Sequence, residues 1–219
     1  TVSHELRTPL ASIKGFATTL LRDDVEWDDL SRREFLSIID EESDRLTELI
    51  GNLLDMAQIE AGTLRVEAEP TDLRRIILET VAEFRMMTHA HQIEATLPPV
   101  LPAVMADPRR ARQILRNLVE NAIKHGLEPR IDGGEIRIMG RMLEWTLPQD
   151  QAVEIIVADT GIGIDPEDLE RIFEKFYRVG DVLLHSTSKT KFKGAGPGLG
   201  LTVARGIVLA HGGRIWAES

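Results

Sequence analysis

Residues 35–56 read FLSIIDEESDRLTELIGNLLDM, and their apolar spacing decides the fold of the first part of the chain. The positions that recur at alternating intervals of four and three residues are Phe35, Ile39, Glu42, Leu46, Leu49, Leu53 and Met56. This is the a/d pattern of a coiled coil or helical bundle, with Glu42 as its one polar member. The stretch therefore predicts a long helix that buries one stripe of side chains.

A second apolar stripe lies upstream and predicts a second helix. Its members are Leu6, Leu10, Ile13, Ala17 and Leu20. The acidic run 22–29 separates the two helices, and Asp28 or Asp29 can cap the second one. We expect residues 1–62 to form a helical hairpin that dimerises into a four-helix bundle, because a lone hairpin cannot bury both faces. The alternative is a hairpin that packs on its own C-terminal domain.

The pattern changes to mixed helix and strand after Ala61-Gly62-Thr63, so we assign residues 63–219 to a second domain. Helices are expected near 72–88, 108–125, 166–172 and 199–211. Strands are expected near 64–68, 92–97, 134–142, 152–158 and 213–218. Because strands and helices do not alternate strictly, we predict an α+β fold with helices on one face of a mixed sheet.

Composition narrows the functional classes. The formal charge of −10 argues against nucleic acid or anionic membrane as partner. The absence of cysteine excludes disulfides, thiolate metal sites and cysteine nucleophiles. The chain opens without methionine and ends at Ile-Trp-Ala-Glu-Ser, so we expect a fragment of a longer protein, with any membrane anchor outside it. We expect this part to be cytoplasmic and to make no direct membrane contact.

The first predicted helix carries a candidate nucleophile. His4 lies about 200° from Leu6 around the helix axis, at about 100° per residue, and should therefore point away from the buried stripe. Thr8 follows one turn later on the same face, and the neighbouring Glu5 can accept a proton from the imidazole. An ordinary surface histidine remains the alternative.

A polar stripe follows one face of the predicted helix 108–125. Asn117, Glu120, Asn121 and Lys124 are spaced by three, one and three residues, opposite an apolar face. Asparagine and glutamate oxygens are suitable ligands for Mg²⁺, and Lys124 can meet a phosphate. The alternative is a solvated helix face.

Two glycine-rich segments complete the set of candidate sites. Asp159-Thr-Gly-Ile-Gly163 follows an apolar strand, where the acid can accept a hydrogen bond from an exocyclic amine and the glycines admit a planar ring. Gly194-Ala-Gly-Pro-Gly-Leu-Gly200 opens the last helix and can present free N–H groups to an anion. The alternative for the first segment is a tight turn closed by its own aspartate.

In this order, the segments resemble the motif set of two-component sensor histidine kinases over nearly the whole chain. The matching segments are Ser3-His-Glu-Leu-Arg-Thr-Pro-Leu10 (H-box), Asn117-Leu-Val-Glu-Asn-Ala-Ile-Lys-His125 (N-box), Asp159-Thr-Gly-Ile-Gly163 (G1 box), Phe173-Glu-Lys-Phe-Tyr-Arg178 (F-box) and Gly196-Pro-Gly-Leu-Gly200 (G2 box). The resemblance implies a dimerisation and phosphotransfer hairpin, followed by an α/β sandwich of the Bergerat type that binds ATP.

The resemblance also implies residue roles. His4 is the expected phosphoacceptor, Glu5 its general base, and Thr8 part of a Glu-x-x-Thr arrangement associated with phosphatase activity. Asn121 is the expected Mg²⁺ ligand. The expected nucleotide-binding residues are Asn117, Asn121, Lys124, His125, Asp159, Gly161, Gly163, Arg178, Gly196, Gly198, Leu199 and Gly200.

The implied function is ATP-dependent autophosphorylation of His4 and phosphotransfer to an aspartate on a response-regulator receiver domain, carried out by a homodimer. Two alternatives remain open from the sequence. One is a Bergerat-type ATPase that uses ATP for conformational work, which would release phosphate without forming a phosphoprotein. The other is a degenerate dimeric scaffold, which would fail to bind nucleotide.

Overall fold

The computed structural model describes residues 2–88, 90–125, 134–143, 152–177 and 198–219. The chain packs as two compact units, Thr1–Gln58 and Ile59–Ser219, which are described separately below. Within the described ranges, no helix is both long enough and apolar enough to cross a membrane.

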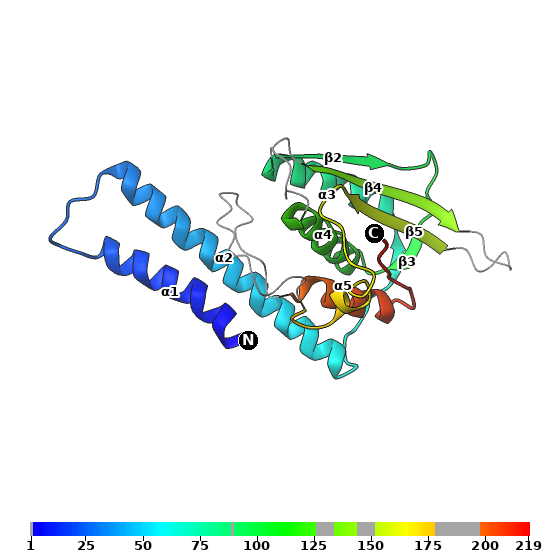
Figure 1. The fold of residues 1–219 in the computed structure, drawn as a ribbon, viewed down its shortest axis with the longest axis horizontal. Coiled ribbons are helices and arrows are strands. Elements are labelled where there is room, and N and C mark those ends of the chain that lie inside the picture. The colour runs from blue at the N-terminus through cyan, green and yellow to red at the C-terminus, as the bar shows by residue number, and fades with distance from the viewer. Residues whose placement is uncertain (1, 89, 126–133, 144–151, 178–197) are drawn as a thin grey trace. The chain divides into compact units, whose positions relative to one another are not determined.

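The first unit is the expected helical hairpin. Helix α1 covers Val2–Leu20 and helix α2 begins at Asp29 and ends at Glu60 (Figure 1). Asp28 caps α2, because its carboxylate accepts hydrogen bonds from the backbone N–H and the hydroxyl of Ser31 at 2.8 and 2.7 Å. These two bonds hold the pKa of the Asp28 carboxyl below its ordinary value. The sequence therefore identified both the helix start and one of its two candidate caps.

Three aromatic side chains hold the turn end of the hairpin. The ring centroids of Phe16 and Phe35 lie 5.4 Å apart, and those of Trp27 and Phe35 lie 5.0 Å apart in an edge-to-face arrangement. All seven positions of the predicted α2 stripe are partly or fully buried. The α1 stripe departs from the prediction at Leu10, which is 57% exposed, while the neighbouring Pro9 is buried.

Within its described residues, the second unit combines two small sheets with three α-helices. Strands β2 (His91–Thr96), β4 (Gly134–Leu143) and β5 (Ala152–Asp159) form a mixed sheet in the order β2-β4-β5, parallel between β2 and β4 and antiparallel between β4 and β5. The same unit contains the helices α3 (Leu73–Met87), α4 (Pro108–His125) and α5 (Gly200–Ala210), which are labelled in Figure 1.

The core of this unit lies between α3, α4 and one face of the mixed sheet. Ile136 and Ile138, two residues apart on β4, are fully buried, which is the period of a strand with one covered face. The side chains that they meet come from both helices and from β2: Ile76, Ile77, Phe84, Ile93, Leu115, Val119 and Ile123. This arrangement confirms the predicted α+β class, with a helical hairpin followed by a mixed helix-and-strand unit.

The structure corrects three of the expected elements. The strand expected at 64–68 is absent there; instead β1 (Glu69–Thr71) pairs antiparallel with β3 (Val104–Ala106), a strand that we did not predict. Both are only three residues long, so periodicity gives little signal. The expected strand 213–218 forms no strand either, because an alternating pattern needs a hydrogen-bonded neighbour to become one.

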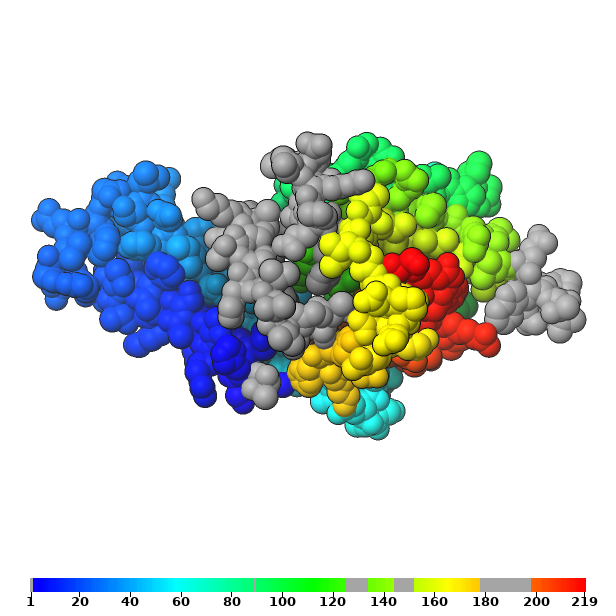
Figure 2. Space-filling model, in the orientation of Figure 1, coloured from blue at the N-terminus to red at the C-terminus, as the bar shows by residue number. Residues whose placement is uncertain are grey.

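The expected helix at 166–172 is a series of turns that ends in a short 3₁₀ helix, η1 (Arg171–Phe173). Its backbone bonds run mainly from residue i+3 to residue i, as from the N–H of Asp168 to the carbonyl of Asp165 at 2.8 Å. The seven residues 166–172 allow few bonds from residue i+4 to residue i, so a helix this short gains little from cooperative elongation. The residues just before this segment contact the C-terminus, because the hydroxyl of Ser219 accepts a hydrogen bond from the N–H of Ile164 at 2.8 Å; in Figure 2 the red C-terminal residues lie beside yellow ones.

Candidate functional site

The candidate nucleophile lies on the solvent side of α1. His4 is exposed, and its imidazole makes no hydrogen bond to any described residue. Thr8 is also exposed, and its hydroxyl donates a hydrogen bond to the carbonyl of His4 at 3.2 Å. Glu5, next to His4, is half-buried. The three predicted catalytic residues therefore share the first two turns of one helix, with both His4 ring nitrogens available to a reactant.

The side chains of the predicted polar stripe on α4 differ in whether they already bond to another residue. The side-chain amide of Asn117 donates a hydrogen bond to the carbonyl of Gly200 at 3.0 Å, which ties α4 to the first residue of α5. The ammonium group of Lys124 pairs with Glu120 at 3.7 Å. Asn121 is partly exposed, and among the described residues no group bonds to its amide. Asn121 is thus the member of the stripe that can accept a ligand without first losing a bond.

The G1 segment forms a tight turn after β5. Asp159 is exposed, and its Oδ1 atom accepts a hydrogen bond from the backbone N–H of Gly161 at 2.8 Å. The backbone N–H of Thr160 donates a hydrogen bond to the carbonyl of Glu135 at 3.2 Å, and the hydroxyl of Thr160 accepts one from the backbone N–H of Glu135 at 3.0 Å. The turn is therefore anchored on β4, and no described residue bonds to the Oδ2 atom of Asp159, which can accept a hydrogen bond from a ligand.

The described part of the G2 segment begins at Gly198 and runs directly into α5. Leu199 is only 1% exposed and its side chain belongs to the core, so only its backbone can face a ligand. Gly198 has φ of +68° and approaches the backbone of Phe176 and Tyr177 closely. The N–H groups at the start of α5 have no carbonyl one turn earlier in the helix, so they can bind an anion.

Two of the predicted nucleotide-binding residues, Arg178 and Gly196, lie outside the described residues. His125 ends α4, but its side chain is not described. Gly163 lies in the turn that follows β5. The structure therefore gives positions for the remaining members of the predicted set within the second unit and leaves these side-chain contacts as predictions.

Two further histidines of the second unit, His91 and His211, are not among the predicted site residues. Both lie in charged or hydrogen-bonded surroundings. His91 is 8% exposed, its Nδ1 lies 3.2 Å from the hydroxyl of Thr88, and its buried Nε2 has no hydrogen-bond partner in the described part. Burial lowers the pKa of His91, and the charge of Asp159 partly offsets this shift. Nothing in the sequence signals this pair, since 67 other residues separate the two positions.

His211 connects the end of α5 to the start of α4. Its Nδ1 donates to the carbonyl of Ile207 at 2.8 Å, and its Nε2 accepts from the backbone N–H of Asp107 at 3.0 Å. Asp107 is buried, and its Oδ1 caps α4 through the N–H groups of Arg109 and Arg110 at 3.0 and 3.2 Å. Burial alone would raise the pKa of Asp107, but the backbone N–H donors of Arg110, Glu67 and Arg109 together hold it below its ordinary value.

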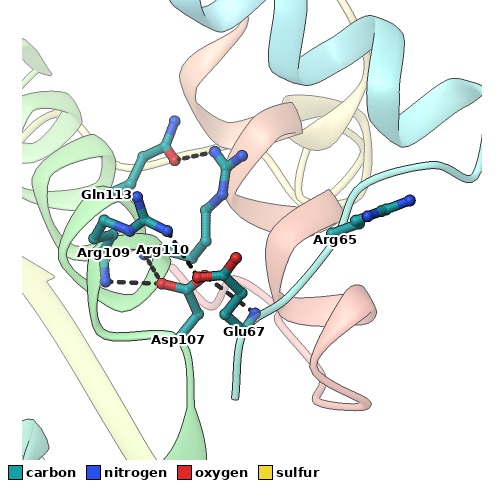
Figure 3. Close-up of a pocket in the computed structure, with 6 residues that line it drawn as sticks. All are labelled: Arg65, Glu67, Asp107, Arg109, Arg110 and Gln113. Atoms are coloured by element: carbon teal, nitrogen blue, oxygen red, sulfur yellow. Dashed lines mark hydrogen bonds and ion pairs between the residues drawn. The ribbon is translucent and has the colours of Figure 1, made fainter. Parts of the chain in front are cut away.

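A surface pocket of about 300 Å³ lies at this N-terminal end of α4 (Figure 3). Its lining is Arg65, Glu67, Asp107, Arg109, Arg110 and Gln113. Arg109 pairs with Glu67 at 3.1 Å, and Asp107 already occupies the helix end. None of these residues belongs to the predicted nucleotide site, and the helix end that would attract an anion is filled by a carboxylate of the chain.

Two family models and several known proteins match the chain. Residues 1–62 match the His Kinase A (phospho-acceptor) domain, and residues 106–219 match the histidine kinase-, DNA gyrase B-, and HSP90-like ATPase family. Histidine protein kinase DivJ of Caulobacter vibrioides is 36% identical over 222 residues, which cover 100% of this chain and 34% of that protein. Sensor histidine kinase WalK of Bacillus subtilis is 32% identical over 219 residues, which cover 100% of this chain and 33% of that protein.

The fold also matches a solved structure, that of full-length ShkA in complex with AMPPNP. The TM-score is 0.67 at 26% sequence identity, and the match covers 99% of this chain and 41% of that chain. The chain spans about a fifth to a third of the length of the curated relatives that it matches. With a phospho-acceptor match over the hairpin and an ATPase match over most of the second unit, the chain belongs to the sensor histidine kinases, a family of protein-histidine kinases.

Proposed function

We propose that the second unit binds ATP with Mg²⁺, that the γ-phosphate moves to a ring nitrogen of His4, and that the phosphoryl group then passes to an aspartate of a response-regulator receiver domain. The observation that carries the proposal is that one chain holds a phospho-acceptor match with an exposed histidine that bonds to no described residue, and an ATPase match with a glycine-rich helix start. The chain covers only about a fifth to a third of its relatives' length, so this part alone does not identify the stimulus or the specific receiver.

The nucleotide would lie along α4, with its base at the G1 turn and its phosphates at the start of α5. Asp159 Oδ2 would accept a hydrogen bond from the adenine amine, while Oδ1 keeps its bond to Gly161. The N–H groups at the start of α5 would bind phosphate oxygens. The relative ShkA, whose structure contains the ATP analogue AMPPNP, supports a nucleotide at this fold.

Asn121 fits the role of a magnesium ligand. Its amide oxygen is a hard donor, and no described group competes for it. Mg²⁺ usually keeps several waters and binds through one or two protein groups together with substrate phosphates, so a single asparagine is sufficient on the protein side. When bound, the ion neutralises charge that develops on the phosphate oxygens.

The transfer step is an in-line displacement at the γ-phosphorus. The lone pair of one imidazole nitrogen of His4 forms the P–N bond, the bond from phosphorus to the β,γ-bridging oxygen breaks, and ADP leaves with that electron pair. Glu5 would accept the proton from the other ring nitrogen, which keeps the ring neutral as the bond forms. In the second step a receiver carboxylate oxygen attacks the phosphorus, the P–N bond breaks with its electron pair going to the ring nitrogen, and Glu5 returns its proton to the other ring nitrogen, which regenerates neutral His4.

We further propose that the hairpin dimerises through its apolar faces, giving a four-helix bundle. Several apolar side chains of α1 and α2 remain exposed in the single chain, among them Leu10, Leu36, Ile50 and Leu54. A second copy that covers them would bury surface that otherwise faces water. Because both ATP and the receiver partner are cytoplasmic, we place this part of the protein in the cytoplasm.

The decisive experiment is incubation with γ-labelled ATP and Mg²⁺, with His4→Gln as the test variant. We expect an acid-labile, alkali-stable label on the parent chain and none on His4→Gln, with ATP affinity unchanged because His4 lies on α1, outside the nucleotide site. Free phosphate without labelled protein would support the conformational ATPase instead. Failure to bind ATP would support the scaffold, and a labelled His4→Gln would contradict the choice of acceptor.

Thr8 is proposed to orient a water molecule for dephosphorylation of the receiver. Its hydroxyl donates to the carbonyl of His4 and keeps acceptor capacity for a water. Thr18 makes the same bond to the carbonyl of Lys14 at 2.7 Å on the same helix, so Thr18→Ala is a matched control. We expect Thr8→Ala to keep autophosphorylation and to slow decay of the phosphorylated receiver, with Thr18→Ala unchanged. If the phosphorylated receiver decayed as fast with Thr8→Ala as with the parent and with Thr18→Ala, Thr8 would have no role in dephosphorylation beyond its bond to the backbone.

A further inference from the structure

The backbone of the F-box is strained at Phe176. Phe176 has φ of +60° and is the single residue other than glycine with positive φ among the described residues. A bulky side chain in this left-handed region is strained, and such strain persists only where the surrounding structure holds it. Phe176 is 42% exposed, so burial of its ring does not explain the conformation.

The backbone of Phe176 contacts the G2 segment. Its backbone N–H donates to the carbonyl of Gly198 at 3.2 Å. A Cβ atom on Gly198 would lie only 2.9 Å from the carbonyl oxygen of Tyr177, so the two backbones are in direct contact. Gly198 is two residues before the first residue of α5, and the carbonyl of Gly200 is held from the other side by Asn117. The position of the α5 N-terminus therefore depends on the F-box backbone at 176–177.

Three side chains fix that part of the F-box in turn. The hydroxyl of Tyr177 donates to Asp168 Oδ1 at 2.5 Å, and Asp168 is only 16% exposed at its side chain. The guanidinium carbon of Arg171 lies 4.3 Å from the centroid of the Tyr177 ring, and the same guanidinium pairs with Asp168 at 3.6 Å. Each of the three side chains thus contacts the other two, and Tyr177 is the member next to the strained Phe176.

We infer that Tyr177, Asp168 and Arg171 form a clamp that positions the α5 N-terminus for nucleotide phosphates. These are positioning residues, since none of them is placed in contact with nucleotide. The inference rests on the proposed function, in which the N–H groups at the start of α5 bind phosphate. The clamp holds the F-box backbone, Phe176 holds Gly198, and Gly198 sets the direction in which those N–H groups point.

If the clamp positions the α5 N-terminus, its removal should weaken binding of the nucleotide phosphates without weakening binding of the base. Removal of the Tyr177 hydroxyl or of the Asp168 charge should leave the base site at Asp159 intact, so adenosine affinity should not change. Affinity for AMPPNP with Mg²⁺ should fall about five- to tenfold, the usual effect of one hydrogen bond to a charged group that is partly screened by solvent. A general loss of folding would instead weaken both ligands together.

The test measures AMPPNP and adenosine affinities by calorimetry for the parent, Tyr177→Phe, Asp168→Asn, the double variant and Asp165→Asn. Asp165 is an exposed acid on the same turn, so Asp165→Asn makes the same charge change as a matched control. We expect the phosphate-dependent loss in both single variants, no further loss in the double variant, and none in Asp165→Asn. Unchanged AMPPNP affinity, or equal losses for AMPPNP and adenosine, would overturn the clamp.

A spectroscopic readout separates this inference from the proposed function. Tyr177 is the one tyrosine in the chain, so incorporation of 3-fluorotyrosine gives a single fluorine resonance. The bond to Asp168 raises the pKa of the Tyr177 phenol, with burial adding to the shift. We expect Asp168→Asn to move the fluorotyrosine titration to lower pH, and an unmoved titration would show that the clamp is absent. If the parent failed to bind AMPPNP, the proposed function would fall and the clamp's role in binding phosphate with it.

Discussion

Replacement of Gly198 by alanine tests the contact on which the phosphate site depends. The new methyl group would meet the carbonyl oxygen of Tyr177 at 2.9 Å and two backbone atoms of Phe176 at 3.2 Å. All three are backbone atoms, which cannot rotate away as the end of a long side chain can. Alanine would also have to adopt the φ of +68° found at Gly198.

Two other glycines divide this perturbation into its parts. Gly212 follows α5 with φ of +73°, and a Cβ there meets nothing within 4 Å, so Gly212→Ala reports the backbone conformation alone. That term costs about 1–2 kcal/mol in the free energy of unfolding. Gly200 has an ordinary φ, and its nearest neighbour would be Asn117 Cγ at 3.7 Å, so Gly200→Ala should be close to neutral. Gly198→Ala adds overpacking of about 1–3 kcal/mol to the conformational term, for a total of about 2–5 kcal/mol.

The assay is urea unfolding followed by tryptophan fluorescence in a Trp27→Phe background. The other two tryptophans, Trp145 and Trp216, belong to the second unit, so the signal reports that unit. We expect the order of stability to be Gly200→Ala above Gly212→Ala above Gly198→Ala. AMPPNP affinity should fall for Gly198→Ala even where the variant is fully folded, because the direction of the α5 N-terminus changes.

Equal destabilisation in Gly198→Ala and Gly212→Ala would refute the reasoning. It would mean that the backbone of Phe176 and Tyr177 moves aside at no cost, and the contact could not set the position of α5. Destabilisation by Gly200→Ala of the same size would show that any methyl group at the start of α5 is harmful, which is a different explanation.

Three further predictions concern single residues. Burial lowers the pKa of His91, and the charge of Asp159 opposes this shift. The neutral form of His91 therefore contributes stability that is complete above pH of about 6.5 and is lost as the pH falls through the lowered pKa. The difference in urea midpoint between pH 7.5 and pH 5 should be smaller for His91→Gln than for the parent chain. Asp107→Ala removes the buried cap of α4 and should lower the free energy of unfolding by about 2 kcal/mol at neutral pH, whereas a surface replacement such as Glu69→Ala should change it little. Asp159→Asn should reduce the preference for ATP over GTP in competition binding, since its free oxygen is the proposed acceptor for the adenine amine, and an unchanged preference would exclude that role.

Sequence reasoning succeeded where one helix or strand carries the information. The stripe of residues from Phe35 to Met56, the α4 stripe and the strands β2, β4 and β5 are repeated patterns, and each pattern sets which face of its own element is buried. The cap at Asp28 is local for the same reason. His4 and Thr8 lie one turn apart on a single helix, so spacing alone predicted their common exposed face, whereas the neighbouring Glu5 is half-buried.

Only the tertiary structure decided the contacts between segments that are far apart in sequence. The bond from Asn117 to Gly200 joins residues 83 positions apart, and the bond from Asp107 to His211 joins residues 104 positions apart. The strand β3 exists because β1 pairs with it, and the strand expected at 213–218 finds no neighbour in the described part of the chain. Periodicity measures how one element meets water and apolar surroundings, whereas hydrogen-bond partners, close backbone approaches and charge effects on a buried histidine depend on where the fold brings separate elements together.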